Sequence, residues 1–579
     1  MSSPASSKFE GVAHVKGHAY GALIGCNLEL SFWGGVDPRT GEIIDRHHSL
    51  SGRFVRDGIL AIPSGRGSCS GSGVLLELLL NGNAPKGLVF ARSEDILTLG
   101  VIIAEEFFGK TIPVVTLSAV DFEALLGSNF VQVDGTEVTA CHKDMTPLYQ
   151  SSNPANALPN SAVRLTETDQ AILDGGKGLA AQIGMRILIR VAALFGADRL
   201  LGIEQVYVDG CIYTGPGSLA FAEKLRDWGG KVAVPTTLNS ISVDQLRWRS
   251  QGIESSFGEP AERLAAAYTD MGARPTFTCA PYLLDDAPSQ GTQVAWAESN
   301  AVVYANSVLG ARTIKYPDFL DIIIAITGRA PDAGLHQTAN RLATLHVDCS
   351  STNCNERFQE SLYPLLGYCV GRLAGRHVPV VTGLGAEPVS KDDLKAFGAA
   401  FATVSSAPMF HIVGVTPEAP SLEAATGWKE GLESVQLPPS ELESCFQTLN
   451  SAPSNSQVDL VSLGNPHFSV SEFQRLVDVC RQRMKHPSVT FIITCGRETY
   501  AKAAKAGFVT ALEAFEALII TDTCWCMIES PVIPHSTRHI MTNSAKYAHY
   551  GPGLTGKLFH FGNIESCVRA ACEGVYHSA

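Results

Sequence analysis

The chain of 579 residues is longer than one hydrophobic core usually supports, and this length predicts about three or four core-forming units. Hydrophobic residues make up 45% and charged residues 17%, as in ordinary globular proteins, which excludes an intrinsically disordered chain. The formal net charge of −13 disfavours nucleic acid and anionic membrane as partners, because both recruit clustered Lys and Arg. We therefore expect a small-molecule substrate.

The sequence offers no sign of a membrane anchor or a secretory leader. No apolar run approaches the roughly 20 residues that span a bilayer, and the first 20 residues lack a basic segment followed by an apolar one. We expect a cytoplasmic protein, either a monomer or a homo-oligomer. Thiols stay reduced in that compartment, so the 15 cysteines predict buried side chains and metal ligands rather than disulfides.

Residues 1–150 alternate short strand-like and helical runs, which predicts a small α/β domain. The buried strands are predicted at residues 58–63 (GILAIP), 86–91 (KGLVFA) and 112–117 (IPVVTL), with a helix at 73–80 (GVLLELLL). Residues 151–161 (SSNPANALPNS) concentrate Ser, Asn and Pro without periodicity, and we expect an interdomain linker there.

Residues 162–579 are predicted to form a large α/β body. A helical region at 166–193 begins with a capping pattern of Thr166 and Asp169. Strand-like runs then alternate with helical ones, and residues 416–439, which are acidic and rich in Pro, predict a surface excursion. The runs lie at 206–209, 231–234, 322–327, 378–381, 460–463 and 491–494.

A glycine- and serine-rich turn, residues 63–73 (PSGRGSCSGSG), lies between a predicted strand and a predicted helix. Glycines let the backbone approach a ligand closely, and a helix N-terminus presents unpaired N–H groups. One interpretation is an anion-binding turn in which one of its serines (Ser64, Ser68, Ser70 or Ser72), near Arg66, acts as a base. The other is an ordinary turn that caps a helix.

The same turn permits a third interpretation, from another class of protein. Gly65, Gly67 and Gly71 have a spacing similar to that of a dinucleotide-binding turn, which would make the chain a nicotinamide-dependent oxidoreductase. However, the turn carries four serines and a cysteine where a pyrophosphate site generally presents bare backbone.

Four cysteines follow strand-like or apolar segments and are candidates for metal binding: Cys279, Cys354, Cys495 and Cys524. Their spacing does not match the close pairs of a zinc site or a ferredoxin, so a cluster would have to be assembled from distant loops. Taken singly, each fits a buried structural thiol better than a metal ligand.

Polar residues at predicted strand ends and at one helix start are candidates for substrate binding. Residues 542–546 (TNSAK) place Asn543 and Ser544 before a helix and Lys546 in its first turn, a pattern suited to a carboxylate and also typical of plain helix capping. Because ligands collect at the carboxyl ends of strands in open α/β sheets, four further residues are candidates by location: Asp209, Gly210, Cys211 and Asn239.

Taken together, these segments resemble the aconitase X family over nearly the whole chain. Besides the PSGRGS turn, the matching segments are 196–200 (GADRL), 234–239 (VPTTLN), 279–282 (CAPY), 297–300 (AESN), 304–313 (YANSVLGART), 464–467 (GNPH), 522–524 (DTC) and 542–546 (TNSAK). The resemblance implies an α/β fold in which a small swivelling domain is fused ahead of a large, multi-lobed catalytic body.

The resemblance also implies a dehydration in which an iron–sulfur cluster binds the departing hydroxyl and Ser68 takes the proton. Cys279 and Cys524 fall on cluster positions, but a third cluster position carries Asn465, where two-chain members of the family have cysteine. We therefore expect a [2Fe–2S] cluster with Cys354 as its third ligand, with Cys69 or Cys495 as substitutes. Asn465 itself becomes a candidate for substrate binding.

Two features of the chain, its fusion into a single polypeptide and Asn465, are similar to those of the family members that dehydrate cis-3-hydroxy-L-proline to Δ1-pyrroline-2-carboxylate. Dehydration of mevalonate 5-phosphate or another hydroxy acid is the alternative within the family, and a cluster used only for sensing is an alternative without turnover. Charge favours the proline-type substrate, because Asp209 would repel a phosphate and attract a ring ammonium.

Overall fold

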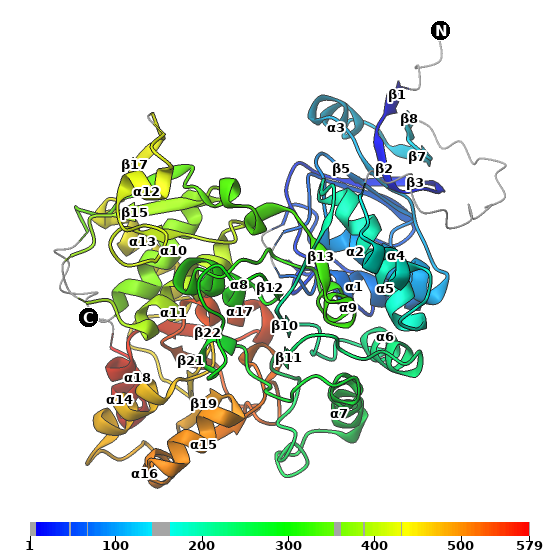
Figure 1. Ribbon diagram of the computed structural model, residues 1–579. Coiled ribbons are helices and arrows are strands. Elements are labelled where there is room, and N and C mark those ends of the chain that lie inside the picture. The colour runs from blue at the N-terminus through cyan, green and yellow to red at the C-terminus, as the bar shows by residue number, and fades with distance from the viewer. Residues whose placement is uncertain are drawn as a thin grey trace. The chain divides into compact units, whose positions relative to one another are not determined.

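The computed structural model describes residues 7–577 apart from 46–47, 67, 142–162, 353–360, 386–387 and 430. It divides into two compact units, which Figure 1 shows coloured along the chain. Unit 1 takes in the described residues up to Ile203, together with Tyr213–Val234 and Tyr316–Ala333. Unit 2 comprises Glu204–Ile212, Pro235–Lys315 and the described residues from Gly334 onward. The predicted linker lies outside the described residues.

An eight-stranded mixed sheet forms the centre of unit 1. Its four central strands are parallel, and antiparallel strands extend it on both sides. The order is β1 (Ser7–Glu10), β8 (Glu137–Cys141), β7 (Phe130–Asp134), β3 (His18–Gly25), β4 (Gly58–Ile62), β5 (Gly87–Phe90), β6 (Val114–Thr116) and β2 (Val12–Val15). The three predicted strands are confirmed as β4, β5 and β6, since each is an apolar run buried in the sheet.

Seven helices and a small ribbon accompany this sheet among the described residues of unit 1. The predicted helix at 73–80 is confirmed as α1 (Gly71–Asn81), and Thr166 and Asp169 form a capping box at the start of α4 (Glu167–Leu173). The others are α2 (Ile96–Phe108), α3 (Ala119–Leu125), α5 (Leu179–Leu194), α6 (Pro216–Asp227) and α9 (Leu320–Thr327), and the ribbon pairs β9 (Leu200–Gly202) with β13 (Arg329–Pro331).

Three parallel sheets build unit 2, as expected for a large α/β body. The first has the order β11 (Thr236–Leu238), β10 (Gln205–Val208), β12 (Val294–Trp296). The second is β16 (His411–Ile412), β15 (Pro379–Thr382), β14 (Leu345–Asp348), β17 (Ser434–Gln436). The third is β20 (Leu518–Thr521), β19 (Thr490–Cys495), β18 (Leu460–Leu463), β21 (His539–Thr542), β22 (Leu558–Phe561).

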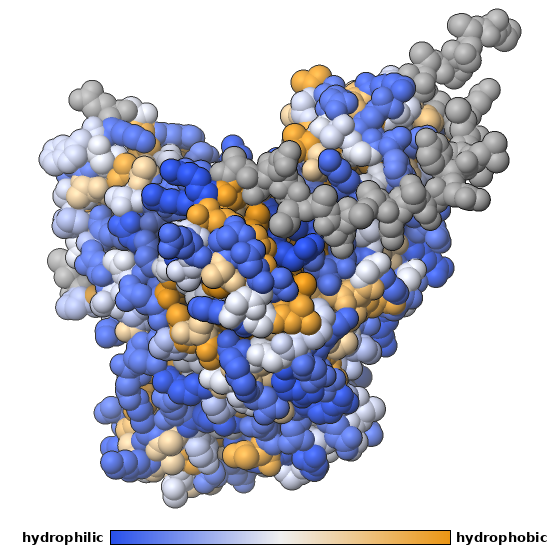
Figure 2. Space-filling model, turned by 45° about the vertical axis from the view of Figure 1, so that its right-hand side comes forward, coloured by the Kyte–Doolittle hydropathy of each residue, from blue (hydrophilic) through white to orange (hydrophobic). Residues whose placement is uncertain are grey.

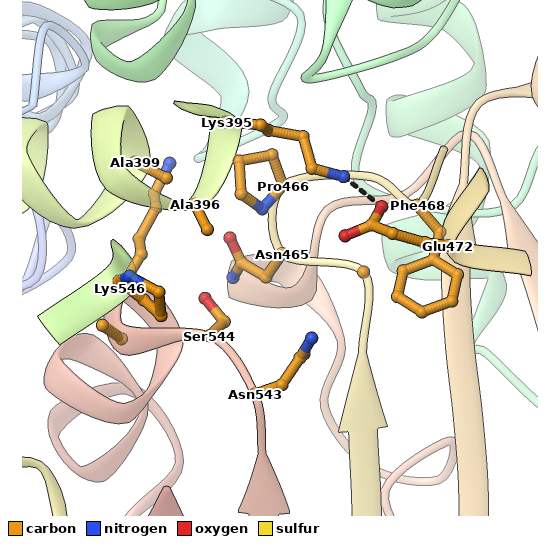
Figure 3. Close-up of a pocket in the computed structure, with 13 residues that line it drawn as sticks. Lys395, Ala396, Ala399, Asn465, Pro466, Phe468, Glu472, Asn543, Ser544 and Lys546 are labelled. Atoms are coloured by element: carbon orange, nitrogen blue, oxygen red, sulfur yellow. Dashed lines mark hydrogen bonds and ion pairs between the residues drawn. The ribbon is translucent and has the colours of Figure 1, made fainter. Parts of the chain in front are cut away.

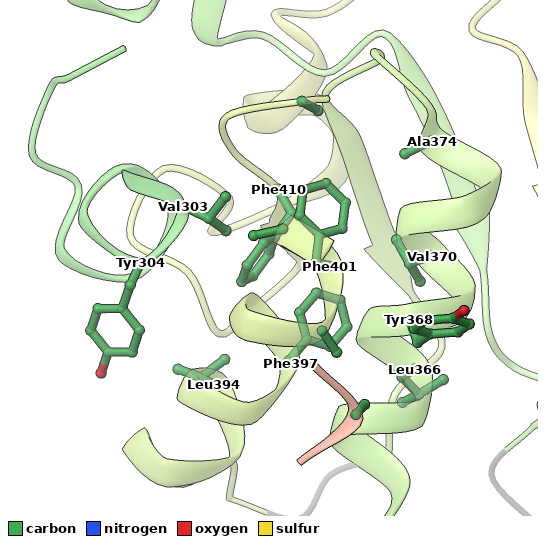
Figure 4. Close-up of a cluster of buried hydrophobic side chains, with 14 of the residues drawn as sticks. Val303, Tyr304, Leu366, Tyr368, Val370, Ala374, Leu394, Phe397, Phe401 and Phe410 are labelled. Carbon is green, nitrogen blue, oxygen red and sulfur yellow. The ribbon is translucent and has the colours of Figure 1, made fainter. Parts of the chain in front are cut away.

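Helices that connect and cover these strands supply the buried core of unit 2. They are α7 (Ser255–Asp270), α8 (Ser299–Tyr304), α10 (Leu362–Ala374), α11 (Lys391–Val404), α12 (Leu422–Thr426), α13 (Pro439–Leu449), α14 (Val470–Cys480), α15 (Arg497–Lys505), α16 (Phe508–Ala514), α17 (Ala545–Thr555) and α18 (Ile564–Glu573). Figure 4 shows one core cluster, in which Phe397 and Phe401 of α11 pack with Phe410. The Phe397 and Phe410 rings are 4.6 Å apart, so α11 is held firmly where its other face lines the candidate site.

Two predicted strands are wrong. Residues 322–327 lie in α9, which is buried along its whole length and therefore shows no helical periodicity of polar residues. Residues 231–234 are not in a strand, and the strand follows them as β11. The excursion at 416–439 contains α12 and the edge strand β17.

Hydrophilic side chains cover much of the face seen in Figure 2, with hydrophobic residues in patches between them. Among the helices that the structure describes, none is both long and apolar enough to cross a membrane.

Candidate active site

The serine turn of unit 1 leads from β4 into α1. Ser68 is half-buried and its Oγ lies 3.3 Å from both the Oγ and the backbone N–H of Ser70, at the N-cap of α1. The guanidinium of Arg66 donates to the carboxylate of Asp45 at 3.1 Å and to the carbonyl of Glu29 at 3.1 Å. The charge of Arg66 is therefore engaged by Asp45, and the donor next to Ser68 is the helix N-terminus.

The predicted polar residues at strand ends meet in unit 2. Asp209 follows β10 and Asn239 follows β11, and because these strands are parallel neighbours, the amide of Asn239 donates to the carboxylate of Asp209. Both side chains are buried. Cys211 is also buried, and its thiol donates to the carbonyl of Val208 at 3.5 Å, in the turn that contains Gly210.

Three cysteine sulfurs gather in unit 2: those of Cys279, Cys524 and Cys526. The Sγ atoms of Cys524 and Cys526 are 2.9 Å apart, and Cys279 shares a hydrogen bond with Cys524. Hydrogen bonds from Cys279 and Cys526, together with the nearby ammonium of Lys546, lower the pKa of the Cys524 thiol. Burial and the bond to Cys524 raise the pKa of Cys279, so Cys524 is the sulfur that most readily carries the negative charge.

Among the other predicted metal ligands, Cys495 does not join this group. Cys354 lies outside the described residues, Cys69 belongs to unit 1, and Cys495 is buried at the end of β19. Within the described ranges, no three His, Cys, Asp or Glu side chains stand ready to hold a metal ion.

A pocket lies beside the start of α17. Ser544 is the N-cap of α17 and accepts from the backbone N–H of Tyr547 at 3.1 Å, as the sequence predicted. Figure 3 shows Asn465, Ser544 and Lys546 around the same space, with Asn543 below them. The amide oxygen of Asn465 is buried there without a hydrogen-bond partner.

Sequence reasoning missed several residues that complete this region. Glu298 forms an ion pair with Lys546, with 2.7 Å between Oε1 and Nζ. On the far side of Asn465, Lys395 forms an ion pair with Glu472 (Figure 3). Two of these residues could have been found in the sequence, because Glu298 lies in the matched AESN segment and Cys526 forms a C-x-C pair with Cys524. No sequence pattern points to Lys395.

Comparisons with known proteins agree with this architecture. Four aconitase X models match the chain: the swivel domain at residues 8–140, the first domain at 162–339, the second at 343–447 and the third at 458–573. A cis-3-hydroxy-L-proline dehydratase from Hypocrea jecorina is 60% identical over 579 residues, covering 99% of this chain and 96% of the relative. One from Pseudomonas aeruginosa is 50% identical over 562 residues, covering 97% and 96%.

A solved structure supports the same assignment. The crystal structure of Thermococcus kodakaraensis aconitase X in its holo-form matches with a TM-score of 0.63 and 32% identity, covering 71% of this chain and all of that one. The chain therefore belongs to the aconitase X family, as its motifs predicted. Within that family it is a hydro-lyase, and the oxidoreductase interpretation of the glycine turn is set aside.

Proposed function

We propose that the chain dehydrates cis-3-hydroxy-L-proline to Δ1-pyrroline-2-carboxylate. The observation that carries this proposal is the identity of 60% and 50%, over nearly the full chain, to two dehydratases of that substrate. Loss of the proton at C2 and of the hydroxyl at C3 forms a C2=C3 double bond. A tautomeric shift then moves the double bond between N1 and C2, so the net change is the loss of one water.

The substrate carboxylate is proposed to bind at the N-terminus of α17. The first N–H groups of a helix lack intrahelical partners and attract anions, and Lys546 adds a full positive charge beside them. Ser544 uses its hydroxyl to cap the helix, which leaves the N–H groups of Ala545 and Lys546 for the ligand. A held carboxylate fixes the ring and accommodates the charge that develops when the C2 proton leaves.

The charges around the pocket support a zwitterionic ligand rather than a phosphate. Lys546 is balanced by Glu298, and Lys395 is balanced by Glu472, with Asp392 3.7 Å away. A phosphate dianion generally needs two or more uncompensated cations or a dedicated N–H nest. The ring ammonium is proposed to donate to the unpartnered oxygen of Asn465, with the buried carboxylate of Asp209 favouring positive charge near the strand ends.

Three thiols are proposed to hold an iron–sulfur cluster: those of Cys279, Cys524 and Cys526. Thiolate is the ligand that iron–sulfur clusters use, and these thiols stand beside a cation that stabilises negative charge. The hydroxyl of Tyr547 also agrees with a cluster at this place. It is buried without a hydrogen-bond partner, and the thiols of Cys526 and Cys524 add to the effect of burial in raising its pKa. Cys526 then takes the place expected for Cys354, and a [2Fe–2S] cluster remains our proposal. When bound, the cluster would supply a Lewis acid for the departing hydroxyl.

Ser68 is proposed as the base that removes the C2 proton. The N–H of Ser70 and the positive end of α1 would stabilise its alkoxide form, and its half-buried position leaves the Oγ accessible.

The proposal is tested with anaerobically purified protein, cis-3-hydroxy-L-proline and no added nicotinamide, with mass spectrometry to detect a product lighter by one water. Formation of that product supports the proposal. Absence of turnover in iron-loaded protein, or turnover only with nicotinamide, would refute it.

A further inference from the structure

One buried histidine connects the loops that carry two of the cysteines. The side chain of His467 is fully buried in the loop after β18. Its ring Nδ1 lies 3.2 Å from the hydroxyl of Thr278, and its Nε2 lies 2.9 Å from the carbonyl oxygen of Thr523. Thr278 and Thr523 directly precede Cys279 and Cys524. A single rigid ring therefore spans the two segments from which these thiols project.

The backbone of the same residue reaches one of the thiols. The N–H of His467 donates to the Sγ of Cys279 at 3.2 Å. On its other side, the carbonyl of His467 accepts from the ammonium of Lys395 at 3.2 Å. Lys395 is buried and its charge is balanced by Glu472, so this contact anchors the loop to α11.

The hydrogen-bond partners define which ring nitrogen carries the proton. The carbonyl of Thr523 can only accept, so Nε2 is the donor, and Nδ1 of the neutral ring accepts from the hydroxyl of Thr278. Both nitrogens are thus used, and neither is left for a metal or a substrate.

We infer that His467 is a positioning residue, which sets the spacing between the Cys279 and Cys524 thiols and so determines how firmly the chain retains its cluster. This inference rests on the proposed function, because the cluster itself is part of that proposal. A histidine that merely stabilises the core would lower the melting temperature when replaced, without a specific effect on iron.

His411 provides a matched control. It too is buried in unit 2, its Nε2 donates to the carbonyl of Arg341 at 2.7 Å, and burial lowers its pKa. It contacts none of the three cysteines in the hydrogen bonds described. Replacement of His411 therefore reproduces the loss of a buried, neutral histidine bonded to a backbone carbonyl.

The experiment compares His467→Asn, His467→Gln, His411→Asn and His411→Gln with the parent. Asn can keep the bond at the Nδ1 position and Gln the one at the Nε2 position, so each His467 variant loses one link. Iron release to a chelator and the decay of visible absorbance are measured on holoprotein, with the melting temperature recorded for every sample. We expect both His467 variants to release iron about 10- to 100-fold faster than the parent, the usual cost of removing a group that orients a metal ligand. The His411 variants should retain iron at the parental rate.

Parental iron release in the His467 variants, or equally fast release from His411 variants of matched melting temperature, would overturn the inference. A parent protein without iron would refute the proposed cluster instead. In that case, alkylation of the cluster-free chain by iodoacetamide, followed by mass spectrometry, still tests whether His467 positions the two thiols. Faster labelling of Cys279 and Cys524 in the His467 variants alone supports the positioning role, and parental labelling contradicts it.

Discussion

The ammonium of Lys546 lies 2.7 Å from the carboxylate of Glu298, and the two side chains are only 15% and 11% exposed. Glu298 is itself fixed, because it accepts from the backbone N–H of Ala301 at 3.0 Å at the start of α8. Burial disfavours the ammonium, but Glu298 and the neighbouring thiols outweigh burial and hold the pKa of Lys546 well above its ordinary value. Lys546 thus remains charged at every pH at which the enzyme is assayed.

Replacement of Lys546 by Met should lower kcat/KM by about 10- to 100-fold, since a hydrogen bond to a charged group is worth about 1.5–3 kcal/mol. Most of the loss should appear in KM, because the lysine holds the carboxylate before reaction. The control is Lys502→Met, which removes an exposed ion pair with Asp285. A KM within twofold of the parental value in Lys546→Met would exclude Lys546 from substrate binding.

Ser68→Ala should reduce kcat by on the order of 100-fold or more, the usual contribution of a positioned base. The fold should persist, because Ser68 is half-buried and the hydrogen bonds of its hydroxyl to described residues lie within its own turn. Ser72→Ala serves as the control, since that hydroxyl donates to the carbonyl of Cys69 at 3.0 Å and is structural. Parental kcat in Ser68→Ala would assign the base elsewhere, with Ser70 as the first alternative.

Single Cys-to-Ser replacements at positions 279, 524 and 526 should each lower the iron content and bleach the visible absorbance, because oxygen is a poorer ligand than thiolate for this iron. Cys495→Ser should retain parental iron, since Cys495 lies outside the group of three. Cys354→Ser decides the third ligand: full iron in Cys526→Ser together with loss in Cys354→Ser would reverse our assignment.

The buried carboxyl of Glu94 should make the stability of unit 1 depend on pH. Its buried carboxyl accepts from the N–H groups of Leu97 and Thr98 at 2.9 and 3.1 Å, and burial, with the charge of Asp95, raises its pKa from 4.5 to about 8. Between these values the folded chain binds more protons than the unfolded chain, so this carboxyl makes stability fall as pH rises from about 4.5 to about 8. As pH rises across that window, the parent should therefore lose stability relative to Glu94→Gln, and the difference in melting temperature should shift in favour of the variant. Parallel melting-temperature curves for the two proteins would contradict the prediction.

The sequence predicted what depends on local pattern and missed what depends on distant contacts. Apolar runs located β4, β5, β18 and β19, whereas α9 was mistaken for a strand because its neighbours bury it on all sides. Cys279 and Cys524 were found through their motifs, but the contact between Cys524 and Cys526 needs the turn that follows β20. The ion pair of Lys395 with Glu472 beside Asn465 could not be predicted from the sequence, because α11 and the loop of Asn465 come together only in the folded chain.

The kcat/KM of anaerobically purified holoenzyme for cis-3-hydroxy-L-proline, measured beside that for mevalonate 5-phosphate, tests the proposed reaction most directly. The balanced charges of Lys546 and Lys395 predict turnover of the hydroxyproline and little or none of the phosphate. Faster turnover of mevalonate 5-phosphate would contradict both the proposed substrate and the charge argument on which its place in the pocket rests.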